Sequence, residues 1–183
     1  NGHESRIIIP LEYNGEPVLS ISESAFEGLT SIKTVYISDN VQNIKSNAFL
    51  ACGAKSIYIG KGVKTIGDYA FADCIEVSKL TYSAVNCNNL SRYGFYFRHL
   101  GQQSEECELV ISASVTRIPD WLFYGTNYQN YADAKVIRFE DNSECKEIGY
   151  AAFMHMRGVK EFDWGKNPSV EIIRDSSIAV LVS

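Results

Sequence analysis

Apolar and polar residues alternate in seven short runs along the 183-residue chain. Each run is only a few residues long and is rich in Ile, Val and Tyr. Alternation of this kind predicts a short β-strand with one inward face and one outward face. The seven runs are RIIIP (6–10), TVYIS (34–38), SIYIG (56–60), KLTYS (79–83), ELVIS (108–112), VIRFE (136–140) and EFDWG (161–165).

A second pattern follows each run after a turn, and its clearest copy is VKTIGDYAFADC (63–74). The shared pattern is V-x-x-I-x-x-x-A-F-x-x-C/L, and its Ile or Leu anchor recurs at 21, 44, 66, 90, 118, 148 and 173. Each copy has room for about one helical or 3₁₀ turn before the next strand. Strand, turn and short helical turn at a period near 23 residues predict one coil of a solenoid.

The residues that recur at this period are predicted to form the core. A single coil cannot bury its own apolar edge, so the coils must stack and equivalent side chains must form columns. The Ile and Leu anchors, Leu90 included, form one such column. The Phe residues of the A-F pairs are predicted to form an aromatic column of Phe26, Phe49, Phe71, Phe95, Phe123 and Phe153.

The repeat resembles the BspA-like branch of the leucine-rich repeats, which reads roughly I-x-I/L-P-x-x-V-x-x-I-G-x-x-A-F-x-x-C. The segments 29–52 and 63–74 carry this pattern, and IIIPLEYNGEPVLSIS (7–22) resembles the first coil of the family. The resemblance implies a mainly β, right-handed solenoid of about seven coils with short helical or 3₁₀ turns. One domain would cover 1–183, with insertions near 96–106 and 124–134 and a terminal coil at 167–183.

Charge and hydropathy exclude two classes of partner. The net charge is −5, and the Lys and Arg residues are scattered, whereas nucleic acid requires a basic stripe. No run of eighteen apolar residues occurs, so no membrane insertion is expected. The first residues, NGHESRIII, lack the pattern of a signal peptide.

The five cysteines imply neither a zinc site nor a complete disulfide framework, because their number is odd and no C-x-x-C pair occurs. Cys52 and Cys74 occupy one repeat position, three residues after the Phe. They are interpreted as small buried hydrophobic residues. The alternative is a Cys52–Cys74 disulfide, because equivalent strands of neighbouring coils lie about 4.8 Å apart. Cys107 lies in an insertion and is predicted to be the most exposed cysteine.

Signatures of catalysis are weak in the sequence. His3, His99 and His155 lie far apart and have no metal-ligand spacing. No G-x-S-x-G, P-loop or G-x-G-x-x-G motif occurs. We therefore expect no catalytic residue, no metal ligand and no cofactor, and a protein that is not an enzyme.

The side chains that point outward are the candidates for function. On the sheet face these are Tyr36 and Tyr58, predicted to be adjacent, together with Thr81 and Arg138. Exposed Tyr offers a large contact area and a polar tip at low entropic cost. A second candidate is the Tyr-rich insertion, whose composition is typical of recognition loops. Its binding candidates are Tyr124, Tyr128 and Tyr131.

These observations favour a non-catalytic interaction module that binds a protein or glycan ligand. The family resemblance implies a bacterial cell-surface or secreted, extracellular setting and a role in adhesion. The alternatives are a structural spacer or stalk that presents another domain and, more distantly, an accessory domain of a carbohydrate-active or other enzyme. The apolar segment SIAVLVS (177–183) lacks a polar cap. An uncapped solenoid end predicts one of three outcomes: the segment folds back as a terminal strand, the natural chain continues, or two C-terminal coils meet in a homodimer.

Overall fold

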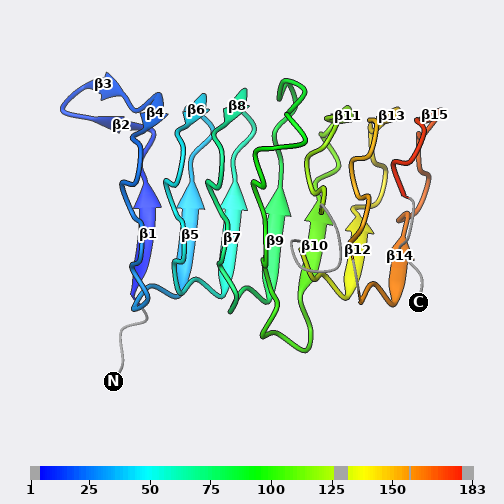
Figure 1. The fold of residues 1–183 in the computed structure, drawn as a ribbon. Helices are drawn as coiled ribbons and strands as arrows, with labels where there is room; N and C mark the ends of the chain where they lie inside the picture. The colour runs from blue at the N-terminus through cyan, green and yellow to red at the C-terminus, as the bar shows by residue number, and fades with distance from the viewer. Residues whose placement is uncertain (1–4, 126–131, 157, 179–183) are drawn as a thin grey trace.

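The computed structural model describes residues 5–125, 132–156 and 158–178. The chain winds into stacked coils, and one strand of each coil enters a seven-stranded parallel sheet, so that about six turns of the chain join the seven strands (Figure 1). All seven predicted strands are present. In sheet order they are β1 (Arg6–Ile9), β5 (Thr34–Ile37), β7 (Ser56–Ile59), β9 (Lys79–Tyr82), β10 (Glu108–Ile111), β12 (Val136–Phe139) and β14 (Glu161–Asp163).

Two smaller parallel sheets lie beyond the carboxyl ends of these strands, in the upper part of Figure 1. One contains β4 (Ser20–Ile21), β6 (Asn43–Ile44) and β8 (Thr65–Ile66). The other contains β11 (Arg117–Ile118), β13 (Glu147–Ile148) and β15 (Ile172–Ile173). The first coil also carries an antiparallel pair, β2 (Glu12–Tyr13) and β3 (Glu16–Pro17).

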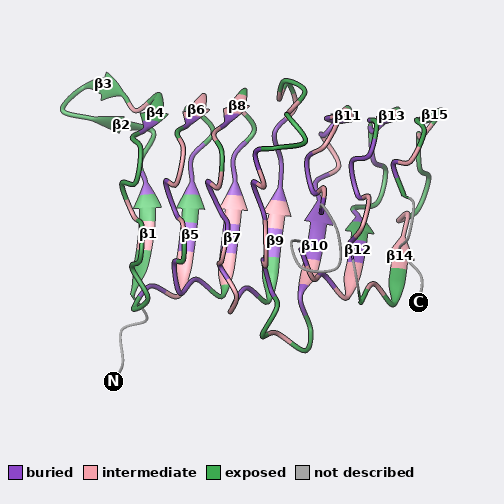
Figure 2. Ribbon diagram, in the orientation of Figure 1, coloured by how far each residue is buried: buried purple, intermediate pink, exposed green. Residues whose placement is uncertain are grey.

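The core lies inside the coils, and burial alternates along most strands of the large sheet as the pattern predicts, with β10 as an exception (Figure 2). In β5, Val35 and Ile37 are fully buried whereas Tyr36 is exposed. The Phe rings stack from coil to coil, with Phe71 parallel to Phe49 at 5.3 Å between centroids. Burying a side chain of this size stabilises the fold by about 1.5–3 kcal/mol. Stacked coils therefore supply the apolar core that no single coil has.

The segments that contain the A-F pairs differ from the expected helical turns. Within the described residues they are hydrogen-bonded turns and contain no helix. The reason is that alternate backbone N–H groups donate to the next coil: Phe49 N–H donates to Ala70 O at 2.8 Å and Ala51 N–H to Ala72 O at 2.9 Å. A left-handed residue, such as Asn47 at φ 57°, also interrupts each segment. Bonds between coils thus replace the bonds within a helix.

The aromatic column passes through Phe97 and not through the predicted Phe95. The Phe97 ring stacks on Phe71 at 5.2 Å and contacts Phe123 at 4.8 Å. Phe95 is half-buried, has a left-handed backbone (φ 44°) and contacts Tyr69 instead. Leu90, expected as a core anchor, is only partly buried and lies outside any strand.

Two further expectations for this part of the chain were wrong. Cys107 is fully buried rather than exposed, and burial raises the pKa of its thiol to about 12. Cys87 is the cysteine with partial exposure. The segment predicted as the first insertion begins inside the core, because Tyr96, Phe97 and Leu100 are buried. Both errors have one cause. Placing Phe95 instead of Phe97 in the aromatic column puts the end of this coil too early in the sequence.

Candidate functional site

The predicted binding residues of the sheet face lie in one row across the large sheet. The parallel register pairs Tyr36 of β5 with Tyr58 of β7, and Tyr58 with Thr81 of β9. The same row begins at Ile8 of β1 and ends at Asp163 of β14. We call it the outer row, and its members are Ile8, Tyr36, Tyr58, Thr81, Val110, Arg138 and Asp163.

The N-terminal half of the outer row is apolar and aromatic. The rings of Tyr36 and Tyr58 stack at 4.7 Å between centroids and 6° between planes. Ile8 beside them is 56% exposed and Tyr36 is 42% exposed. Partial burial, and then the neighbouring Tyr58 and Asp39, raise the pKa of Tyr36, so its hydroxyl is protonated at neutral pH. This half offers a rigid aromatic surface with hydrogen-bonding tips.

The C-terminal half of the outer row is charged. Arg138 is exposed and forms ion pairs with Glu108 of β10 at 3.0 Å and with Asp163 of β14 at 3.7 Å. Between the two halves lies Val110, which the register places in the outer row but which is only 5% exposed. Thr81, next to it, is half-buried. The sheet face therefore divides at β10 into an aromatic half and an ion-paired half.

The Tyr-rich insertion is described only at its start and end. Tyr124 is half-buried, and its ring contacts Trp121 at 4.7 Å and His155 at 6.1 Å. Tyr128 and Tyr131 lie outside the described residues. The structure therefore leaves this candidate as a prediction.

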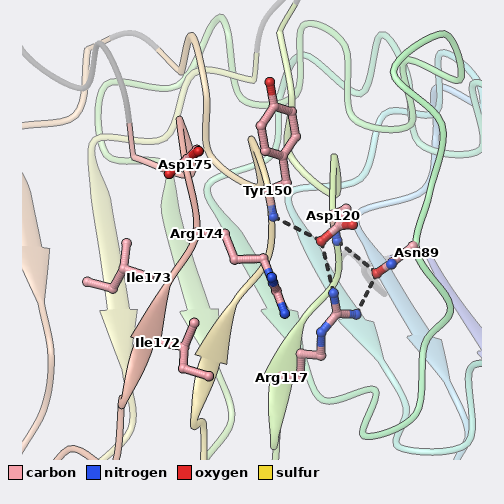
Figure 3. A pocket seen from close by; sticks show the side chains of 8 residues that line it. All are labelled: Asn89, Arg117, Asp120, Tyr150, Ile172, Ile173, Arg174 and Asp175. Atoms are coloured by element: carbon pink, nitrogen blue, oxygen red, sulfur yellow. Dashed lines mark hydrogen bonds and ion pairs between the residues drawn. The ribbon is translucent and has the colours of Figure 1, made fainter.

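The structure contains a polar cleft beside β11, β13 and β15 that the sequence did not predict. Its volume is about 480 Å³ (Figure 3). The repeat pattern does not predict this cleft, because the lining residues come from four coils and the repeat is most irregular there. One local signal was present, the Arg117-x-x-Asp120 pair, which forms an ion pair at 2.9 Å. The lining residues are Asn89, Arg117, Asp120, Tyr150, Ile172, Ile173, Arg174 and Asp175.

A second cleft, of about 340 Å³, lies at the first coil and is apolar. Ile9, Ile21 and Phe26 line it, and these belong to the core columns. The cleft therefore lies on the core residues of the first described coil.

The part of the chain that the structure describes offers neither a metal site nor a membrane-spanning helix. The described ranges contain no cluster of three or more His, Cys, Asp or Glu residues able to hold a metal ion. They also contain no apolar helix of the length that a bilayer crossing requires. His99 Nδ1 lies 2.7 Å from Asp73 Oδ1, but Arg98 also contacts that carboxylate, so the dyad belongs to an ion-pair cluster.

Comparison with known protein families matches residues 8–130 to the BspA type leucine-rich repeat region, in six copies. The match covers more than half of the chain, so the protein belongs to this family of repeat proteins. Comparisons with curated proteins and with solved structures found no match. Repeat proteins of this family are typically non-catalytic ligand-binding modules and are generally surface-associated.

Proposed function

We propose that this chain is a non-catalytic, protein-binding module that acts in adhesion at the bacterial cell surface or in secreted form. The stacked Tyr36–Tyr58 pair on an exposed parallel sheet carries the proposal. Parallel sheets are usually covered on both faces. An exposed face with an aromatic row is therefore typical of a surface that a partner covers.

The composition of the outer row favours a protein over other ligands. Tyr is among the residues that contribute most to binding at protein interfaces. Ile8 extends the apolar strip, and Arg138 and its carboxylate partners form a polar rim at the other end. An apolar centre with a charged rim is the usual anatomy of a protein interface.

The area of the sheet face limits how the partner binds. Six strand spacings of about 4.8 Å make the sheet about 29 Å wide, and four residues make each strand about 13 Å long. The sheet face therefore has an area of about 400 Å². Each partner in a standard protein interface contributes about 800 Å², which is more than this face provides. The partner must therefore also contact a rim of the solenoid, for which the Tyr-rich insertion with Tyr124, Tyr128 and Tyr131 is our candidate.

A binding screen separates this proposal from the spacer alternative. The immobilised solenoid is exposed to an array of purified extracellular-matrix and cell-surface proteins. We expect at least one saturable interaction that a Tyr36→Ala/Tyr58→Ala double variant loses. A spacer would bind none of the arrayed proteins. Binding that is equally strong without the two Tyr rings would contradict the sheet-face site.

A further inference from the structure

We propose that the polar cleft beside β11, β13 and β15 is a second binding site, which accepts a neutral, hydroxyl-rich sugar. It is separate from the sheet-face site, because its residues come from the turns and short strands beyond the carboxyl ends of the large sheet (Figures 1 and 3). The cleft exists because residues 87–92 form no strand between β8 and β11. Asn89 of that segment lines one side of the cleft and Arg174 and Asp175 line the other.

The polar groups of the cleft are held in place by one another. Asp120 Oδ1 accepts hydrogen bonds from Arg117 Nη2 and from the Tyr150 backbone N–H, both at 2.9 Å. Asn89 Oδ1 accepts from Arg117 and from the Asp120 backbone N–H (Figure 3). A Cβ atom at Gly149 would lie 2.5 Å from Asp120 Oδ1, so only Gly allows this close approach. The site is therefore preorganised before any ligand binds.

The charge of the cleft favours a neutral ligand. Arg117 and Arg174 both contact Glu147 Oε1, at 3.2 Å and 2.5 Å. Glu147, Asp120 and Asp175 supply three carboxylates against these two guanidinium groups. Anionic ligands such as phosphates would therefore be repelled. Carboxylates accept and guanidinium and amide groups donate, which suits hydroxyl groups that both donate and accept.

One wall of the cleft is aromatic and another is aliphatic. Tyr150 is 39% exposed, and Trp121 packs against its ring at 4.9 Å and 64° between ring planes. Ile172 and Ile173 are 48% and 49% exposed. An aromatic face attracts the weakly positive C–H groups of a sugar ring, because the face of a π-system carries partial negative charge.

The size and shape of the cleft are consistent with this ligand. Its volume of about 480 Å³ lies within the range of about 300–1,000 Å³ that is usual for small-molecule sites. The polar lining argues against an apolar ligand, which would displace water from these groups without replacing the hydrogen bonds of that water. A sugar bound in an open cleft of this kind buries little area, so we expect an affinity near the millimolar range for one ring.

A glycan array tests the proposal. The probes are neutral mono- and oligosaccharides, with sialylated and sulfated glycans on the same array. We expect binding to a subset of the neutral probes. For the strongest of these, titration calorimetry should show that Tyr150→Ala weakens binding at least tenfold, whereas Tyr150→Phe retains it because the ring remains. Circular dichroism and thermal melting check that both variants are folded.

The sheet-face variant Tyr36→Ala/Tyr58→Ala is the matched control, and we expect it to bind the neutral sugar as well as the wild type does. Its result makes the failure of this proposal distinguishable from the failure of the sheet-face proposal. Binding to no glycan, binding only to acidic glycans, or neutral-sugar binding that survives Tyr150→Ala would each overturn the second site.

Discussion

The recurring Phe residues stabilise the solenoid because each ring contacts its equivalents in the coils before and after it. Phe71 is fully buried between Phe49 and Phe97, with centroid distances of 5.3 Å and 5.2 Å. Phe26, in contrast, is half-buried and stacks only on Phe49, at 5.1 Å. The energetic weight of the same repeat position therefore depends on its place in the stack.

This difference leads to a prediction for two matched substitutions. Phe71→Ala should lower the free energy of unfolding by about 3–5 kcal/mol, because it removes a fully buried ring and leaves a cavity. Phe26→Ala should cost less, because that side chain is already partly in water. Urea denaturation of both variants and the wild type measures the two values. Equal losses at both positions would contradict the stacked-column account.

At the scale of structural elements, the two thiols of Cys52 and Cys74 join neighbouring coils without a covalent bond. Both side chains are buried, and their sulfur atoms lie 3.3 Å apart. The Cys74 thiol also donates to Phe49 O at 3.2 Å. The structure therefore brings this pair of the five cysteines into contact, as their shared repeat position predicts.

We predict that oxidation by diamide joins this pair. Diamide would take up the two electrons and two protons released as the Cys52 and Cys74 thiols become a disulfide. Thiol counting under denaturing conditions should fall from the five of the sequence to three. The bridge should stabilise the fold by about 3 kcal/mol. In a Cys52→Ser variant the count should stay at four, and a wild-type count that also stays unchanged would refute the pairing.

The ion pairs across β11, β13 and β15 lead to a second prediction at this scale, which concerns how stability depends on pH. Hydrogen bonds from Arg174 and then Arg117 lower the pKa of Glu147, although partial burial opposes this. A carboxylate with a lowered pKa stabilises the folded state above its unfolded pKa, near 4.3. That contribution is lost as the pH falls through the lower folded pKa.

Glu147→Gln should therefore destabilise the protein at pH 7 by at most about 1 kcal/mol, because the pair is partly exposed and screened by solvent. The difference between variant and wild type should shrink as the pH falls below about 4. Urea denaturation at a series of pH values measures it. A difference that grows on acidification would show that Glu147 is not held as a carboxylate.

These elements show how far the sequence predicts this fold. The strands, their register and the adjacency of Tyr36 and Tyr58 follow from a uniform period, because a fixed spacing places equivalent residues side by side. The segment YGFYF (93–97) was not predictable in this way, because it offers more than one aromatic residue to the column. The stacking of its ring on Phe71 in the preceding coil selects Phe97 over Phe95.

The polar cleft depends even less on local pattern. It requires Asn89, Asp120 and Tyr150 to meet, and they come from three coils with unequal spacing. Where the period changes, the sequence does not fix which residues become neighbours. The most irregular region of the repeat was therefore the least predictable and contains the candidate sugar site.

At the scale of the whole molecule, apolar side chains are exposed in both the first and the last described coil. The cleft at the first coil is lined by core residues, and Ile172, Ile173 and Ile178 are exposed in the last described coil. The predicted C-terminal segment 177–183 lies largely outside the described residues. An exposed solenoid end favours association, because a further coil would bury it.

A homodimer through the C-terminal coil accordingly remains a prediction. Light scattering over a dilution series should show the mass falling from dimer toward monomer as the concentration is lowered. An Ile172→Asp/Ile173→Asp variant should shift the midpoint to a higher concentration, because it places charge on the apolar end. A monomer mass at every concentration would exclude the dimer.

The central claim is that the aromatic half of the outer row binds a protein partner. The most direct test is the dissociation constant, measured by biolayer interferometry, for a protein that the binding screen identifies. Tyr36→Ala/Tyr58→Ala should raise this constant at least about tenfold, since central aromatic residues of an interface contribute about 2 kcal/mol or more. Tyr93→Ala removes a Tyr that is 63% exposed away from the large sheet, and should leave the constant unchanged. Equal dissociation constants for the double variant and the wild type would contradict the account.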